Sequence, residues 1–522
     1  MILTRHLKMY DKLIRNALIY DGTGKAPYRA NVALFGDRIA FIGNERIARA
    51  KDVIDASNLI LTPGFIDIHT HTDLLILSDP DMSPRINQGI TTDVTGNCGI
   101  GVFPSSGDEL KSAVSDVLGE WKDWGWDDYR SYKKYAEKNG IATNEAFLVS
   151  HTALRLKALG GNAGRSATDA EIEVMCSLLD ELLSEGCWGF STGLYYAPCV
   201  FAERKELIAL LKVVKKHDKL FAVHHRCEGN DVLESLSEVI EAARETGVRL
   251  EVSHLKAIGV RNQDKVPQML EMIERARRDG VDVKFDQYPY TFGSTSLFSL
   301  LPPHILSLSR FEQRLALSLE NEREELKKEV MNPDGWDSIY EMVGPENITA
   351  LYLEGHKEYS GLTLSEIGKE RKKDPLDALF DILSEETGLA VMTDITESED
   401  NLRLIMKHPL ASFGSDSLYS SPIPHPRSYH GTVEYLSKFV LDEHILPLEE
   451  GIRRMTGENA ERVGLKFRGL VKEGYYADLL LISPENLRVN GDRNEGIEMV
   501  MVNGEIRKRG NEIAGRRSGM IL

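Results

Sequence analysis

The sequence predicts an α/β chain in which a (β/α)₈ barrel is joined to a small β domain built from both ends of the chain. Three observations lead to this fold class. Short apolar strand segments alternate with amphipathic helical segments through the middle of the chain, and both ends are rich in strand and turn signals. At 522 residues the chain is also too long for one compact hydrophobic core.

The two ends of the chain have the pattern of a single small sheet domain. Residues 13–24, 30–43 and 52–64 are short apolar segments interrupted by Asp-Gly, Gly-Asp and Pro-Gly turn signals. Residues 475–483 and 498–510 are also strand-like, and the second segment contains Asn503-Gly504, a dipeptide typical of a hairpin turn. Strands from both ends are therefore expected to pair in one sheet.

The middle of the chain alternates between strands and helices. One helix is expected at residues 168–186, with a capping box from Thr168 to Glu171 and an end at Gly186. Two more helices are expected at 231–247 and 265–280. The strand segments are 65–71, 91–97, 147–152, 187–192, 220–225, 249–255, 281–288 and 411–416. About eight such units fit a (β/α)₈ barrel, with a doubly wound open sheet as the alternative.

The expected domains follow from this alternation. We assign residues 1–61 and 470–522 to the β domain and residues 62–469 to the barrel. The β–α rhythm breaks between about 292 and 348, where an apolar stretch runs into a charged helical segment. We interpret this stretch as an insertion after a strand.

Composition restricts the classes of partner. A formal net charge of −18 argues against binding to nucleic-acid phosphates or anionic membranes, both of which need a basic surface. No apolar run approaches the roughly 20 residues of a membrane span, and the start of the sequence lacks the features of a secretory signal. Five cysteines suit a reducing cytoplasm. We expect a cytoplasmic enzyme with a small-molecule substrate, and the oligomeric state stays open.

Metal-capable side chains gather at the ends of the predicted strands. His69 and His71 share one face of the first strand, because side chains at i and i+2 point the same way. Other strands end in the same kind of residue, namely Cys98, His224, His254 and Asp416. In a barrel these ends meet at the face that carries catalysis. Thiolate and imidazole are ligands that Zn²⁺ prefers, and three protein ligands with an open position are typical of catalytic zinc.

The same residues lie in motifs that carry a family resemblance over nearly the whole chain. The motifs are PGFIDIHTHTD, VTGNCGIGVFP, HHRCEGN, VSHLKA, DQYPYTFGST, FGSD followed by HPRSYHGT, and RRMTGENAERVGLKFRGLVKEGYYADLLLI. With them the chain resembles the amidohydrolase superfamily and, within it, the N-acyl-D-amino-acid deacylases, or D-aminoacylases. The resemblance implies a distorted (β/α)₈ TIM barrel with a small β-sandwich domain, in agreement with the pattern above.

The resemblance also implies roles for single residues. It assigns a tightly held zinc to Cys98, His224 and His254, and places His69 and His71 beside a second, weaker metal position. It makes Asp416 the general base and then the general acid. It assigns substrate binding to Lys256, Tyr288, Ser294 and Arg427, of which the arginine offers a planar fork to a carboxylate. The implied reaction is zinc-dependent hydrolysis of N-acyl-D-amino acids to a carboxylic acid and a D-amino acid.

Three alternative functions remain. The chain could be a dipeptidase acting on a C-terminal D-residue, which residue identities do not exclude. A hydantoinase-like or dihydroorotase-like cyclic amidase would use a carboxylated strand lysine, but the fourth strand segment, CWGFST, contains none. A non-catalytic scaffold would have lost some of its metal-binding residues, whereas all of the candidate metal-binding residues are present.

Several other polar residues receive structural interpretations. His225 should point away from the metal by strand alternation, and His151 should orient other groups. Arg226 and Glu228 are expected to form an ion pair behind a ligand. The remaining cysteines, Cys176, Cys187, Cys199 and Cys227, are interpreted as buried thiols. His304 stands where relatives commonly have an aromatic residue, and its role and that of the insertion stay open.

Overall fold

The computed structural model describes residues 9–44, 49–161 and 163–522. Eight parallel strands form one sheet in the order β16-β12-β11-β10-β9-β8-β7-β6. Their bounds are β6 Phe65–Asp67, β7 Ile90–Thr95, β8 Asn144–Ser150, β9 Gly189–Gly193, β10 Leu220–His224, β11 Arg249–Val252, β12 Val283–Gln287 and β16 Ala411–Phe413. Each of the eight predicted strand segments overlaps one of these strands.

The first and last strands of this sheet meet just beyond their carboxyl ends. The backbone N–H of Asp416 donates to the carbonyl of His69 at 2.8 Å, and the N–H of His71 donates to the carbonyl of Ser417 at 3.1 Å. Thr70 and Ser417 form a parallel β-bridge at the same place. The sheet therefore closes into the predicted barrel, and the open-sheet alternative is wrong.

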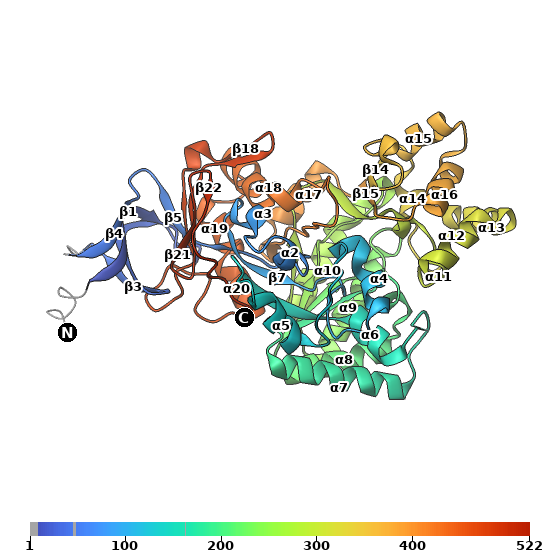
Figure 1. The fold of residues 1–522 in the computed structure, drawn as a ribbon, viewed down its shortest axis with the longest axis horizontal. Helices are drawn as coiled ribbons and strands as arrows, with labels where there is room; N and C mark the ends of the chain where they lie inside the picture. The colour runs from blue at the N-terminus through green and yellow to red at the C-terminus, as the bar shows by residue number, and fades with distance from the viewer. Residues whose placement is uncertain (1–8, 45–48, 162) are drawn as a thin grey trace.

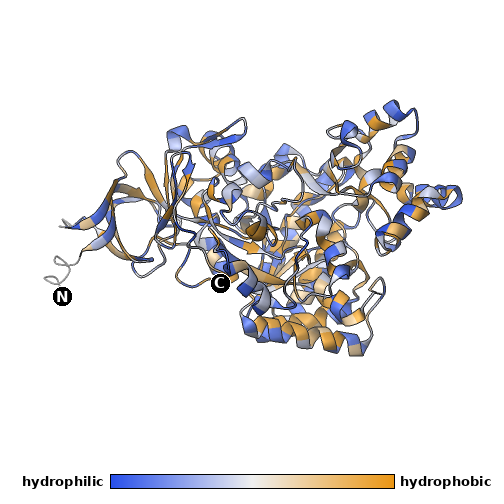
Figure 2. Cartoon of the chain, viewed as in Figure 1, coloured by the Kyte–Doolittle hydropathy of each residue, from blue (hydrophilic) through white to orange (hydrophobic). Residues whose placement is uncertain are grey.

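Helices surround the barrel, as Figure 1 shows. The predicted helix after Thr168 is α7 (Asp169–Glu185), which has the expected capping box with Glu171 and the expected cap at Gly186. Figure 2 shows apolar and polar residues alternating along α7, so one face can pack on the barrel. The other surrounding helices are α2 Leu75–Ser78, α3 Ser83–Ile86, α4 Asp108–Leu118, α5 Tyr129–Glu137, α6 His151–Leu159, α8 Arg204–Lys216, α9 Val232–Thr246, α10 Val266–Arg278, α17 Glu399–Lys407, α18 Arg427–Glu434, α19 Leu448–Arg454 and α20 Gly457–Val463.

Strands from both ends of the chain form a separate sheet, at the left of Figure 1. They are β1 Tyr10–Ile19, β2 Tyr28–Phe35, β3 Arg38–Gly43, β4 Ala50–Asp55, β5 Ile60–Pro63, β17 Leu479–Ile482, β20 Ile497–Val502, β21 Glu505–Arg509 and β22 Glu512–Ile513. β5 pairs with β17, which joins the two ends, and the predicted hairpin at Asn503-Gly504 connects β20 to β21. Val32, Leu61 and Leu481 share one buried cluster. The predicted β domain formed by both ends is confirmed.

A third layer covers the open face of the barrel, at the upper right of Figure 1. It contains an antiparallel sheet of β13 (Phe292–Ser296), β15 (Ala390–Ile395) and β14 (Ile348–Leu353). Its helices are α11 Pro303–Leu306, α12 Arg310–Ser318, α13 Glu320–Met331, α14 Ile339–Val343, α15 Leu364–Arg371 and α16 Pro375–Glu385. These elements share a hydrophobic core distinct from that of the barrel, and this core continues past the predicted insertion, residues 292–348, to Met392.

A buried ion network holds the barrel together at its seam. Arg85, on α3, is completely buried, and its Nε lies 2.9 Å from Asp93 Oδ1 on β7. The same guanidinium pairs with Asp67 on β6 and donates to Ser417 Oγ, just after β16, at 2.9 Å. One side chain therefore links both sides of the closure beneath the site.

Replacing Arg85 with methionine should destabilise the fold by about 3–5 kcal/mol, because Asp67 and Asp93 would stay buried without their cation. Equilibrium unfolding in urea measures this as a lower midpoint. The matched control is Lys111→Met, which breaks an exposed pair with Asp108 at 3.0 Å and should change stability little. Equal midpoints for the Arg85 variant and the wild type would contradict this account of the seam.

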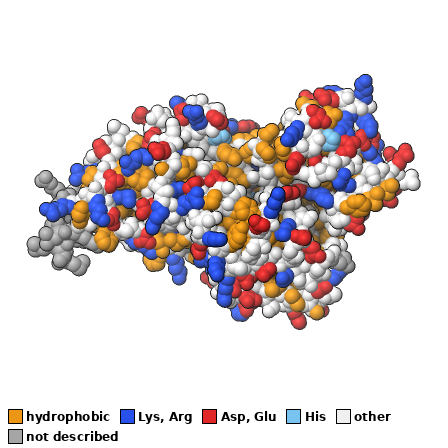
Figure 3. Space-filling model, viewed as in Figure 1, with side chains coloured by type: hydrophobic (Ala, Val, Ile, Leu, Met, Phe, Trp, Pro, Cys, Tyr) orange, Lys and Arg blue, Asp and Glu red, His pale blue; other side chains and the backbone are white. Residues whose placement is uncertain are grey.

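The surface carries charged side chains of both signs. On the face seen in Figure 3, acidic and basic side chains of the described residues are interspersed without a continuous basic stripe. Across the residues that the structure describes, none of the helices has the length and apolar character needed to span a bilayer.

Candidate metal centre and active-site pocket

The metal-capable residues predicted from the sequence converge at the carboxyl ends of the barrel strands. His69, His71, Cys98, His224, His254 and Asp416 are all at most 7 % exposed. Cys98, His254 and Asp416 have φ angles of 52°, 34° and 51°, in the left-handed region that side chains other than glycine rarely adopt. This strained backbone, typical of functional sites, turns each side chain out of its strand direction toward the common centre.

Two groups of ligand atoms overlap at Cys98. One group contains His69, His71, Cys98 and Asp416, and the other contains Cys98, His224 and His254; in each, the ligand atoms lie within 4.8 Å of one another. Cys98 Sγ lies 3.2 Å from His69 Nε2 and 3.6 Å from His254 Nε2. The second group is the thiolate and imidazole set that suits Zn²⁺.

The local structure holds Cys98 tightly in this position. Gly193, at the end of β9, packs so closely that a Cβ there would lie 2.3 Å from the carbonyl oxygen of Cys98, so only glycine fits. Burial alone would raise the pKa of the Cys98 thiol, but the imidazoles of His69, His224 and His254 hold that pKa well below its ordinary value. The thiol is therefore prepared to be a thiolate, the form that binds metal.

Asp286, at the end of β12, contacts the imidazole of His69 and the backbone of His254. Its Oδ1 lies 3.0 Å from His69 Nδ1 and accepts the backbone N–H of His254 at 3.0 Å. A carboxylate on Nδ1 leaves Nε2 of His69 free to face the centre. This residue was not among the predicted site residues, although FDQY places an acid on the strand next to the ligand strand.

His224 provides the test of whether the residues fit a metal. Neither of its buried ring nitrogens has a hydrogen-bond partner among the described residues, which is costly for a polar group unless a ligand binds there. Its Nε2 lies 3.4 Å from Glu228 Oε2, and Glu228 also lies 3.2 Å from His254 Nδ1 and from Lys256 Nζ. Imidazole nitrogens that make no hydrogen bond among the described residues, next to a low-pKa thiol, fit a zinc site.

The expected ion pair between Arg226 and Glu228 is wrong. Arg226 instead pairs with Glu238 on α9 at 3.0 Å, because the chain turns after β10 and directs the two side chains apart. Glu228 faces the pocket. This role was not predicted, although the i, i+4 spacing from His224 is a signal that could have indicated it.

Asp416 and Arg427 form a direct ion pair in the lining of the pocket. Arg427 Nη2 lies 2.8 Å from Asp416 Oδ2, and Asp416 Oδ1 lies 3.2 Å from His71 Nε2. Burial would raise the pKa of Asp416, but Arg427, His69 and His71 hold that pKa well below its usual range. The carboxylate is therefore charged and lies beside the candidate metal ligands.

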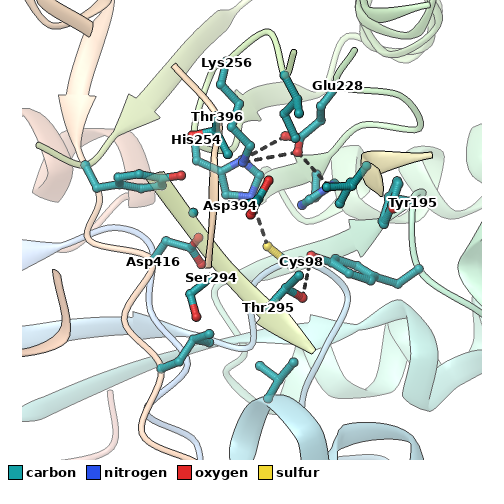
Figure 4. Close-up of a pocket in the computed structure, with 18 of the residues that line it drawn as sticks. Cys98, Tyr195, Glu228, His254, Lys256, Ser294, Thr295, Asp394, Thr396 and Asp416 are labelled. Carbon is teal, nitrogen blue, oxygen red and sulfur yellow. Dashed lines mark hydrogen bonds and ion pairs between the residues drawn. The ribbon is translucent and has the colours of Figure 1, made fainter. Parts of the chain in front are cut away.

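The predicted substrate-binding residues line the same pocket, which encloses about 650 Å³ of space, part of it open to solvent (Figure 4). Lys256 Nζ lies 3.0 Å from His254 Nδ1. The ring of Tyr288 lies 4.7 Å from the Arg427 guanidinium, and its hydroxyl has no hydrogen-bond partner in the described part of the chain. Ser294, on β13, accepts from Arg427 through its carbonyl at 3.2 Å.

Other residues considered in the sequence lie outside the pocket lining. His151 is bonded at both nitrogens, to Thr192 and to Glu206, each at 2.8 Å. His225 points away from the centre and contacts Ser235 at 3.1 Å. The side chain of His304 is 57 % exposed and lies 3.4 Å from Glu329. It does not line the pocket. Cys187, Cys199 and Cys227 are buried and Cys176 is half-buried, all as free thiols.

One further pocket residue was missed by the sequence analysis. Asp394, on β15, is 4 % exposed, and its Oδ2 has no hydrogen-bond partner among the described residues. Burial raises its pKa to about 6. No sequence signal indicated it, because β15 belongs to the covering layer and its pairing with β13 spans about a hundred residues.

The chain is similar to known proteins over nearly its whole length. The amidohydrolase family model matches residues 52–308 and 355–507. An N-acyl-D-aspartate deacylase of Alcaligenes xylosoxydans xylosoxydans is 32 % identical, over 98 % of this chain and 95 % of that protein. The structure of an N-acyl-D-glutamate deacylase from Bordetella bronchiseptica, complexed with zinc and a phosphonate mimic of the tetrahedral intermediate, is similar with a TM-score of 0.85, 30 % identity and coverage of 99 % and 100 %. A D-aminoacylase with a binuclear metal centre has a TM-score of 0.84 at 30 % identity, with coverage of 98 % and 99 %.

Proposed function

The chain belongs to the amidohydrolase family, within the group of the N-acyl-D-amino-acid deacylases, and from this premise we propose that it hydrolyses the linear amide bond of N-acyl-D-amino acids. The products are a carboxylic acid and a D-amino acid. The observation that carries the proposal is the convergence of Cys98, His224 and His254 beside the Asp416–Arg427 pair.

We assign the tight metal position to Cys98, His224 and His254, and a second, weaker position to His69 and His71 with Cys98 and Asp416. Zinc, when bound, supplies a Lewis acid that polarises a carbonyl and lowers the pKa of a water molecule. A relative complexed with zinc supports this choice of metal, and a relative with a binuclear metal centre supports the presence of two positions. The buried nitrogens of His224, which make no hydrogen bond among the described residues, support it independently.

Asp416 is the proposed proton carrier. In the free protein, Arg427 at 2.8 Å keeps the Asp416 carboxyl charged and its pKa low, which would make it a weak base. A substrate carboxylate at the guanidinium would compete for this cation and raise the pKa of Asp416. The carboxylate would then accept a proton from the attacking water and donate it to the nitrogen of the leaving amine. Substrate binding would thus activate the base.

The proposed carboxylate site is formed by Arg427, Lys256, Tyr288 and Ser294. Two cations and an unpartnered phenol hydroxyl converge there in a buried setting, where charge-assisted hydrogen bonds are strong. The site explains why an amino-acid derivative, and not a simple amide, would be the substrate.

Replacing Arg427 with lysine should lower kcat/KM for N-acetyl-D-methionine by about 10–100-fold, mainly through KM, because lysine keeps the charge but loses the planar fork. Steady-state kinetics measures this. The control substrate is an N-acetyl amine with the same side chain and no carboxylate, on which the variant and the wild type should differ little. An equal loss on both substrates would rule out carboxylate binding by this residue.

The function itself is tested with a panel of N-acyl amino acids in both enantiomers, D-terminal dipeptides and hydantoins, using zinc-loaded protein. Hydrolysis of the N-acyl-D-amino acids with little turnover of the L-enantiomers or hydantoins is the expected result. Preferential turnover of dipeptides or hydantoins would replace the proposal with one of the alternatives.

We also propose that the enzyme works in the cytoplasm. The support is that all five cysteines are free thiols, and one of them is a candidate metal ligand that must stay reduced. Expression of the protein in an oxidising compartment should therefore lower its metal content per chain.

A further inference from the structure

The pocket contains more negative than positive side chains. Two cations line it, Lys256 and Arg427. Each is already matched by an acid, Lys256 by Glu228 at 3.2 Å and Arg427 by Asp416 at 2.8 Å. Among the described residues that line the pocket there is no third lysine or arginine, so an α-carboxylate bound at Lys256 and Arg427 leaves neither for a second carboxylate.

Asp394 adds a further negative charge without a partner. It points into the pocket, and its Oδ2 is buried with no hydrogen-bond partner among the residues described (Figure 4). Gly293 is its cross-strand neighbour. A Cβ at Gly293 would lie 3.1 Å from Thr396 Cγ2, 3.4 Å from Asp394 Oδ1 and 3.6 Å from the Tyr288 hydroxyl, so these side chains lie close together there. Asp394 therefore borders the same space as the proposed carboxylate site.

Two apolar groups line the pocket. Ile258, Ile339 and Met342 belong to the hydrophobic core of the covering layer. Ile100, Val117 and Leu418 belong to the hydrophobic core of the barrel. A substrate side chain in contact with either group meets apolar residues, and Asp394 lines the same pocket.

We propose that Asp394 is a specificity-determining residue that excludes acidic side chains, so that the substrates are N-acyl derivatives of apolar D-amino acids. This inference rests on the proposed deacylase function and deepens it. A second carboxylate on the substrate would be brought next to an unpaired buried carboxylate, and like charges in a desolvated site repel strongly. The chain would thus differ in substrate class from its relatives that act on N-acyl-D-aspartate and N-acyl-D-glutamate.

The test compares kcat/KM for N-acetyl derivatives of D-methionine, D-leucine, D-glutamate, D-aspartate and D-lysine with zinc-loaded enzyme. The wild type should prefer D-methionine to D-glutamate by at least about 100-fold. Asp394→Asn, which keeps the shape and removes the charge, should reduce this ratio about tenfold by improving turnover of the D-glutamate derivative. The matched control Glu346→Gln removes an exposed negative charge near the start of the strand that pairs with Asp394, and should leave the ratio unchanged.

Several results would overturn the inference. A wild-type preference for the D-glutamate, D-aspartate or D-lysine derivative would do so, as would an unchanged ratio in a folded Asp394→Asn variant. If that variant does not fold, the test is the inhibition constant of N-acetyl-D-glutamate, measured against wild-type turnover of N-acetyl-D-methionine. Strong competitive inhibition would show that the pocket admits an acidic side chain and would contradict the inference. Absence of turnover of every N-acyl-D-amino acid would instead reject the proposed function.

Discussion

Cys98→Ala is expected to abolish binding of the tightly held zinc and to lower kcat/KM by more than about 100-fold. Even the loss of a group that only supports a metal ligand lowers metal affinity or activity by about 10–100-fold. Cys98 is the one side chain shared by the two candidate metal groups. Without it, the first group keeps two imidazoles and the carboxylate of Asp416, and the second keeps two imidazoles alone. Metal content per chain after dialysis, measured with steady-state kinetics, checks both effects.

Cys176→Ala is the matched control for this variant. Cys176 is a half-buried thiol on α7, outside both metal groups, so its loss should change neither metal content nor turnover. A Cys98→Ala protein that retains one zinc per chain and full turnover of N-acetyl-D-amino acids would disprove the proposed centre.

Asp416→Asn should lower kcat by about 10²–10⁴-fold while the tight metal is retained, because the amide keeps the size of the side chain but cannot carry the proton. Cys98, His224 and His254 do not depend on it for their contacts. Metal analysis and single-turnover kinetics on the same preparation test this.

The two variants together separate metal binding from proton transfer. Loss of metal in the Cys98 variant and its retention in the Asp416 variant, with both inactive, is the expected pattern. An Asp416→Asn enzyme with near-normal kcat would remove this residue from the reaction, and one that loses its metal would make it a structural ligand.

Much of the barrel could be predicted from the sequence because its signals are local. Strands such as 220–225 and the capping box at Thr168 depend on residues close together in the chain, and the structure contains both elements. The convergence of Cys98, His224 and His254 was also predictable, because parallel barrel strands present their carboxyl ends at one face.

The missed features depend on long-range packing. Asp286 and Glu228 orient imidazoles that lie on other strands, and Asp394 enters the pocket only because β13 and β15 pair across the covering layer. The left-handed backbone at Cys98 and Asp416 also has no sequence signature, since neither residue is glycine. Pairing between distant segments decides these positions.

The covering layer has its own hydrophobic core, while the candidate metal ligands stand on the barrel. Ser294, Ile339 and Asp394 line the pocket from this layer. Mutations there can accumulate without unsettling the reaction chemistry. Over evolutionary time the substrate specificity of such an enzyme can change through the covering layer while the metal centre on the barrel is kept. A chimaera that exchanges this layer would have the substrate specificity of the donor.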